Sequence, residues 1–136
     1  MNIISIKELI IPDVKVIKLK RFYDNRGYFT ETFRKSDIVS VFNEEVVQMN
    51  ESFSKKNVLR GFHFQWNPYM GKLIRTIKGH MIDLILDIRQ GSPTYGKAIA
   101  YDMPITLDLS TESEWIWVPS GFAHGNFFKE TTIIEY

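Results

Sequence analysis

Short segments in which apolar and polar residues alternate fill most of this chain, and they constrain its fold more than any other feature. Alternation at every second residue is typical of a β-strand with one buried face. Turn residues such as Gly27, Asn67 and Gly79 separate these segments. We therefore predict strands over residues 14–20, 28–33, 46–53, 58–65, 72–78, 81–89, 96–106, 114–118, 123–128 and 132–136, with an N-terminal apolar strand within 3–19.

A single helical segment interrupts this pattern. Ser36 is of a type that caps helices, and Asp37 suits the positive end of the helix dipole, so we predict a short helix over residues 36–42. Many short strands with little room for helices indicate an antiparallel sandwich or barrel. We predict an all-β fold, an antiparallel jelly-roll barrel with at most one short helix. No linker or repeat divides the chain, so we expect one domain over residues 1–136.

Charge and cysteine content exclude several classes of protein. The chain has 17 Lys and Arg against 16 Asp and Glu and no Cys. It therefore lacks the cationic surplus of a dedicated nucleic-acid binder, and it can form neither a disulfide nor a thiolate metal site. Lys7 and Glu8 interrupt the first apolar stretch, so this stretch is not predicted to be a secretory signal. No apolar run reaches the ~18 residues that a membrane span needs. We expect a cytoplasmic protein that binds neither nucleic acid nor membrane.

Three predicted strands carry ionisable residues where a β core needs apolar ones. His63 lies in 58–65, Lys72 opens 72–78, and Asp83 lies in 81–89. Because an uncompensated buried charge is strongly destabilising, these residues predict a common polar cavity that holds a small ligand.

Strict alternation places His63 on one face of its strand and Arg60 on the other. Gly61 between them indicates a close approach of backbone or ligand. A purely structural interpretation competes in the strand 81–89, because Asp87 and Arg89 could form a surface ion pair of little energetic value.

A metal site is an open alternative. The candidate ligands are two His and two Glu, His63, His124, Glu31 and Glu51. Residues 119–126 resemble the second motif of the cupin superfamily, in which the His is often a metal ligand. The first cupin motif carries two His, whereas the run 63–65 carries one, and Lys72 nearby repels a cation. We expect no metal and keep a metal-dependent cupin as an alternative.

Six blocks occur in the order found in one enzyme family. They are Asp24-Asn25-Arg26-Gly27, Gln48-Met49-Asn50, the run from Ser54 to Gln65, Gly71-Lys72-Leu73, Ser92-Pro93-Thr94-Tyr95-Gly96, and the run from Val118 to Gly125. Over essentially the whole chain they resemble the dTDP-4-dehydrorhamnose 3,5-epimerases, metal-independent cupins of dTDP-rhamnose biosynthesis. The resemblance implies a cytoplasmic homodimer without a cofactor. The dimer would bind a nucleotide-diphosphate sugar and act in the biosynthesis of lipopolysaccharide sugars.

The resemblance also implies roles for particular residues. His63 is the base, Lys72 stabilises the oxyanion, and Tyr136 is the acid. Phosphate and sugar contacts fall on Arg26, Glu31, Gln48, Asn50, Arg60 and His124, of which Arg26 and Glu31 reach the partner subunit, and Asp83 pairs with His124. Family members continue past this Tyr to an aromatic residue that stacks on thymine and an Asp that orients the catalytic His. Neither has a counterpart here, so a non-catalytic sugar-nucleotide-binding cupin is a second alternative.

The chemistry of these side chains suits epimerisation beside a ketone. A base must remove a proton from one face, an acid must return it to the other, and a cation must stabilise the enolate. Neutral His, with an ordinary pKa of about 6.5, is a free base at neutral pH. The Lys72 ammonium can stabilise the oxyanion, and guanidinium forks bind diphosphate oxygens. We therefore predict an epimerase acting on a nucleotide-linked 4-keto-6-deoxyhexose.

Overall fold

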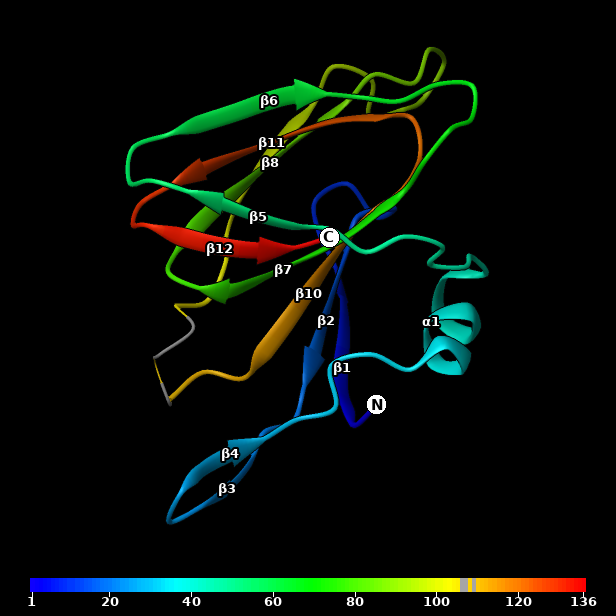
Figure 1. The fold of residues 1–136 in the computed structure, drawn as a ribbon. Coiled ribbons are helices and arrows are strands. Elements are labelled where there is room, and N and C mark those ends of the chain that lie inside the picture. The colour runs from blue at the N-terminus through cyan, green and yellow to red at the C-terminus, as the bar shows by residue number, and fades with distance from the viewer. Residues whose placement is uncertain (106–107, 109) are drawn as a thin grey trace.

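The strands of this chain form two sheets that face each other and a separate hairpin (Figure 1). The computed structural model describes residues 1–105, 108 and 110–136. Its elements are β1 (Ile3–Glu8), β2 (Lys15–Leu19), β3 (Phe22–Asp24), β4 (Gly27–Phe29), α1 (Lys35–Phe42), β5 (Glu51–Ser54), β6 (Leu59–His63), β7 (Lys72–Lys78), β8 (Met81–Asp87), β9 (Ala98–Asp102), β10 (Ser113–Val118), β11 (Phe122–Phe128) and β12 (Thr132–Glu135). One sheet has the order β1-β2-β10-β7-β12-β5 and the other β6-β11-β8-β9.

Two apolar clusters hold the fold together. The larger cluster fills the space between the sheets and includes Ile74, Ile85, Ile116 and Phe128. The smaller cluster covers the outer face of the larger sheet, where Trp115 packs with Ile38 of α1 and other residues. Alternate residues of β7 and β10 thus belong to the two clusters, as period-two patterning requires. Neighbouring strands in both sheets pair antiparallel, which confirms the predicted all-β antiparallel barrel with one short helix.

The β3–β4 hairpin extends away from the two sheets (Figure 1). Its aromatic residues are largely exposed, from 42% for Phe22 and Tyr28 to 68% for Phe29. Tyr28 also stacks on the guanidinium of Arg21 at the root of the hairpin, 4.3 Å from the ring centroid. This arm therefore projects apolar surface that its own chain does not cover.

Several predicted boundaries were wrong. The strand within 3–19 divides at a turn in which Val14 N–H donates to the Ile11 carbonyl. The strand over 28–33 ends at Phe29, and the strand over 46–53 begins at Glu51. The strand over 96–106 spans 98–102, and residue 106 lies outside the described residues.

The predicted helix cap was also wrong. Ser36 is the second residue of α1, while the N-cap position is Arg34, whose side chain makes no capping bond. Ser36 Oγ instead lies 3.2 Å from the carboxylate of Asp37, which is in the first turn as expected. The burial of Ile38 at 1% exposure shows that tertiary packing fixes this helix.

Candidate active site

A register shift between β6 and β11 places two predicted site residues on one face. His63 pairs with His124, and Arg60 pairs with Asn126, so three steps along β6 match two steps along β11. Directly opposed residues share a face of a sheet, so His63 and Arg60 both face the interior side occupied by His124 and Asn126. The prediction that strict alternation puts Arg60 and His63 on opposite faces was therefore wrong.

Gly61 makes this shift possible. Its φ is +111°, and a Cβ added there would lie 2.6 Å from Gly125 Cα and 2.8 Å from the His124 carbonyl oxygen. Only glycine allows two backbones to approach this closely in that conformation. The expected close approach at Gly61 is confirmed, and the approaching group is the backbone of β11.

Asp83 contacts two side chains of β11 on the inner face of the smaller sheet. Its Oδ1 lies 2.6 Å from His124 Nε2 and accepts a hydrogen bond of 2.6 Å from Asn126 Nδ2. Asp83 is fully buried, and its Oδ2 has no partner among the described residues. The expected pairing of Asp83 with His124 is thus present, with Asn126 as an additional donor.

Lys72 approaches the same interior from the opposed sheet. It begins β7 and lies on the face of Ile74, which belongs to the inner cluster, whereas Leu73 belongs to the outer one. Burial lowers the pKa of Lys72, and the field of the Asp83 carboxylate opposes part of this shift. The amine of Lys72 therefore lies in a partly desolvated space between the sheets, where a cation acts strongly on nearby charge.

Tyr136 lies directly after β12, beside the segment that leads into β5. Its backbone N–H and carbonyl both bond to Asn50, at 3.0 and 2.7 Å, and its ring packs against the inner cluster. Gln48 Nε2 donates to Asn50 Oδ1 at 2.8 Å. The structure thus brings Tyr136, Asn50 and Gln48 together at one edge of the larger sheet.

Arg60 bridges the edge strands of the two sheets. Its Nε donates to the buried Ser54 Oγ at 2.8 Å, and its Nη2 donates to the Phe53 carbonyl at 3.1 Å. Ser54 belongs to β5 and Arg60 to β6. The guanidinium is therefore held beside the open edge where the exposed His63 lies.

Two predicted substrate contacts do not reach this interior. Arg26 lies at the tip of the β3–β4 hairpin and pairs with Asp24 at 2.6 Å. Glu31 follows the hairpin and pairs with Arg34 at 2.8 Å and with the N-terminal amine at 3.1 Å. Within one chain, neither residue lies with His63 and Lys72.

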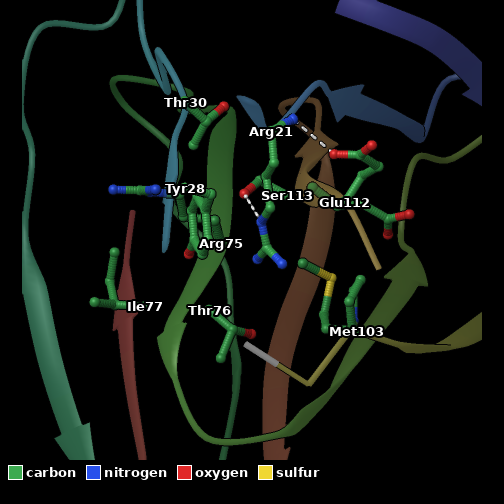
Figure 2. Close-up of a pocket in the computed structure, with 11 residues that line it drawn as sticks. Arg21, Tyr28, Thr30, Arg75, Thr76, Ile77, Met103, Glu112 and Ser113 are labelled. Carbon is green, nitrogen blue, oxygen red and sulfur yellow. Dashed lines mark hydrogen bonds between the residues drawn. The ribbon is translucent and has the colours of Figure 1, made fainter. Parts of the chain in front are cut away.

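A pocket of about 160 Å³ opens elsewhere, between β7 and β10 (Figure 2). These strands pair only from Lys72 to Ile74 and separate beyond that point, so Thr76 lines the pocket from one side and Ser113 from the other. Arg21 Nε donates to Ser113 Oγ at 3.0 Å, and Arg75 is paired with Glu135. The pocket therefore lies toward the end of β7 away from Lys72, and its guanidinium groups already have protein partners.

Asp87 and Arg89 form the ion pair that the structural interpretation allowed, but its carboxylate is buried and does not lie at the surface. Asp87 is fully buried and accepts hydrogen bonds from Arg89, Ser92 and Thr94. These donors hold the pKa of Asp87 well below its usual range, the Arg89 side chain most strongly. The cluster fixes the loop after β8, and these hydrogen bonds involve neither His63 nor Lys72.

Two features of the described residues bear on other classes of function. In the ranges 1–105, 108 and 110–136, no three His, Asp or Glu side chains are grouped so that they could hold a metal ion. The single helix described is too short to cross a membrane.

Sequence reasoning missed Asn126 and Ser54. Asn126 is two residues after His124, so alternation along β11 already placed both on one face. No local signal identified Asp83 as its partner, since the two residues are 43 positions apart. Ser54 is a common residue type in a strand, and only its contact with Arg60 distinguishes it.

The fold and the site define the class of the protein, which is a cupin-type jelly roll with polar side chains between two antiparallel sheets. The sequence profile described as dTDP-4-dehydrorhamnose 3,5-epimerase matches residues 8–136. An epimerase of that name from Shigella flexneri is 43% identical over 92% of this chain, and one from Sinorhizobium fredii is 42% identical over 96%. The chain belongs to the dTDP-4-dehydrorhamnose 3,5-epimerase family.

Solved structures agree with this assignment. The epimerase of Sulfolobus tokodaii superposes with a TM-score of 0.88 at 36% identity and covers 100% of this chain and 74% of its own. An epimerase of Legionella pneumophila in complex with dTDP-4-keto-L-rhamnose gives 0.84 at 32% identity over 96% of this chain and 68% of its own. The chain spans 66% of the length of the Shigella and Sinorhizobium relatives.

Proposed function

We propose that this chain epimerises carbons next to the ketone of a dTDP-linked 4-keto-6-deoxyhexose. The observation that carries the proposal is the placement of His63 and Lys72 on the inner faces of two opposed sheets. A sugar held between the sheets would have an imidazole on one side and an ammonium on the other. The resemblance of the chain to enzymes that bear this name supports the substrate class.

Each group has a distinct chemical task. His63 removes the proton from the carbon beside the ketone, and the Lys72 ammonium stabilises the enolate oxygen that develops. Burial lowers the pKa of Lys72, and the same loss of solvent leaves its charge poorly screened, so that it acts strongly on that oxygen. The phenol of Tyr136 returns a proton on the opposite face. Arg60 binds the diphosphate, with Gln48, Asn50 and His124 contacting substrate.

We further propose a homodimer in which the β3–β4 hairpin reaches the partner subunit. The hairpin carries Arg26 at its tip and exposes Phe29 and other aromatic residues. Docking this arm on a second copy would cover the apolar surface and bring Arg26 and Glu31 to the partner's site. Sedimentation at micromolar concentration should give a dimer, and a monomer would refute this part. The setting proposed from the family resemblance is cytoplasmic sugar synthesis for surface polysaccharide.

The test is exchange of solvent deuterium into the dTDP-linked 4-keto sugar, followed by mass spectrometry. His63→Asn should abolish exchange and leave substrate affinity nearly unchanged, since the amide keeps the shape but is not a base. His80→Asn is the matched control, because His80 lies in the β7–β8 turn and pairs with Asp102. Arg60→Ala should chiefly weaken binding. Exchange that survives in His63→Asn would place the base elsewhere.

One observation favours a second candidate, a cupin that binds the nucleotide sugar without catalysis. Among the described residues, none donates to or accepts from the His63 ring, whereas His124 is oriented by Asp83. A catalytic His without its orienting carboxylate can lose on the order of 10⁴ in rate, as in a serine protease. We therefore expect slow exchange in the unmodified chain. Tight binding with no exchange would establish the second candidate.

A further inference from the structure

Asn126 is the least expected polar residue of the interior. It lies on β11, where it pairs with Asp83 of β8 on one side and with Arg60 of β6 on the other. It is 7% exposed, and its Nδ2 donates to Asp83 Oδ1 at 2.6 Å and lies 3.6 Å from Met81 Sδ. Its side-chain amide is thus committed to one oxygen of a buried carboxylate.

The two carboxylate oxygens of Asp83 differ in their hydrogen-bond partners. Oδ1 contacts both His124 and Asn126 at 2.6 Å, while Oδ2 is buried and has no partner among the described residues. Leaving a buried carboxylate oxygen without a hydrogen-bond donor is strongly unfavourable. The carboxylate therefore gains by turning toward another donor, unless its two contacts at Oδ1 prevent it.

Lys72 lies on the inner face of the opposed sheet, on the side of Ile74, and is a donor that this carboxylate faces across the interior. The ammonium of Lys72 feels the field of Asp83, yet it is not in ion-pair contact with this or any other described carboxylate. An amide that holds Asp83 by one oxygen adds no charge of its own. It can therefore restrain the carboxylate without neutralising it.

We propose that Asn126 is a positioning residue, which anchors Asp83 against His124 and so prevents it from pairing with Lys72. The inference rests on the proposed epimerisation, in which the Lys72 ammonium must meet the enolate oxygen rather than a protein carboxylate. Asp83 then supports the charge of Lys72 from a distance. His124 keeps its Nε2 on Asp83 and presents its other ring nitrogen away from that carboxylate.

Other ionisable groups face this interior from the elements around Lys72. They are His63 and Arg60 of β6, Asp83 of β8, Tyr101 of β9, Glu114 of β10, His124 of β11 and Tyr136 after β12. Glu114 is engaged by the Tyr101 hydroxyl at 2.7 Å and by Lys18 at 3.6 Å. Arg60 is engaged by Ser54. Asp83 is therefore the carboxylate that a change at Asn126 releases toward Lys72.

The test measures the titration of Lys72 without any substrate. The chain is reductively methylated with ¹³C, and the Lys72 signal is assigned by its absence in Lys72→Arg. Asn126→Leu should raise the Lys72 pKa by about 1, because the freed Asp83 forms an ion pair with it. Asn126→Ala removes the donor without overpacking and makes the same test if the Leu variant does not fold. Thr132→Val is the control, since it removes a buried hydroxyl that bonds to the His80 carbonyl and not to Asp83.

Deuterium exchange supplies the second readout. Asn126→Leu should slow exchange roughly 10- to 100-fold and move the basic limb of its pH profile upward, because the misplaced Lys72 stays protonated longer. In Asn126→Asp, the protonated acid can still donate to Asp83, so exchange should be retained at low pH and lost as pH rises. Unchanged Lys72 titration in folded Asn126→Leu or Asn126→Ala would overturn the inference. Absence of exchange in the unmodified chain would instead refute the proposed function, and the titration would remain a test of Asn126.

Discussion

Replacing Gly61 with alanine should lower the free energy of unfolding far more than the same change at Gly91. Both glycines have positive φ, +111° and +81°, so both replacements place a side chain in a conformation that L residues rarely adopt. This backbone strain amounts to about 1–2 kcal/mol at either position. At Gly91 nothing lies within 4 Å of the new Cβ, so the strain is the whole expected loss.

At Gly61 a second contribution is added. The new Cβ would lie 2.6 Å from Gly125 Cα and 2.8 Å from the His124 carbonyl oxygen, which are backbone atoms and cannot rotate away. Overpacking of this kind typically costs about 1–3 kcal/mol. The expected total is roughly 3.5 kcal/mol, against roughly 1.5 kcal/mol at Gly91. For a chain of this size that is a fall in Tm of roughly 12 °C against roughly 5 °C.

Urea unfolding of both variants measures the difference directly, provided that the slope of free energy against urea is unchanged. Gly61→Ala should also reduce deuterium exchange, because separating β6 from β11 moves both His63 and Arg60. Equal losses of stability in Gly61→Ala and Gly91→Ala would refute the reasoning. They would mean that the contact with β11 relaxes at little cost and that this glycine does not set the register of the site.

Two other changes test the electrostatics of the interior. Asp87→Asn should lower the free energy of unfolding by about 3 kcal/mol at pH 7, because it removes the buried charge that pairs with the half-buried Arg89 and leaves that guanidinium only its exposed contact with Asp13. The pKa of Asp87 is lower in the folded chain than its unfolded value of 3.8, so the stability that Asp87 contributes is present above pH 3.8 and is lost as the pH falls below that value. The free energy of unfolding should therefore fall less steeply from pH 5 to pH 2 in the variant than in the unmodified chain. Lys72→Met should raise Tm at pH 7 while abolishing deuterium exchange, because burial opposes the charge of this amine. In the unmodified chain, Lys72 binds fewer protons in the folded state than in the unfolded state just below pH 10.5, so the stability that Lys72 contributes should rise with pH toward that value. A Tm of Lys72→Met lower than that of the unmodified chain at pH 7 would contradict this account.

Strand patterning predicted the parts of the fold in which each residue responds only to its own face. In β8, Met81, Asp83, Ile85 and Asp87 are all buried, while the residues between them are partly exposed. Alternation alone identified this strand and the face on which Asp83 lies. Helix α1 was also predicted, although its cap was not, because packing of Ile38 rather than a local hydrogen bond determines where it begins.

The faces of β6 could not be predicted from its own residues. The register shift depends on Gly125, which lies 64 positions after Gly61 and offers no side chain at the point of contact. The partners of Asp83 and Asp87 depend in the same way on residues that only the folded chain brings close. Local sequence thus predicts which residues are polar and buried, and it predicts poorly which of them meet.

The arrangement of the site follows from this nonlocal contact. Without the shift, Arg60 would face away from His63, and a diphosphate bound by Arg60 could not lead into a sugar placed beside that base. With the shift, Arg60 and His63 are three residues apart on one strand and share the interior face with His124. Ser54 then fixes Arg60 from the opposite sheet, as Asn126 and His124 fix Asp83. Under the proposed function, two glycines on neighbouring strands therefore align the phosphate-binding group with the proton-transfer group, and substitutions at Gly61 should affect binding and exchange together.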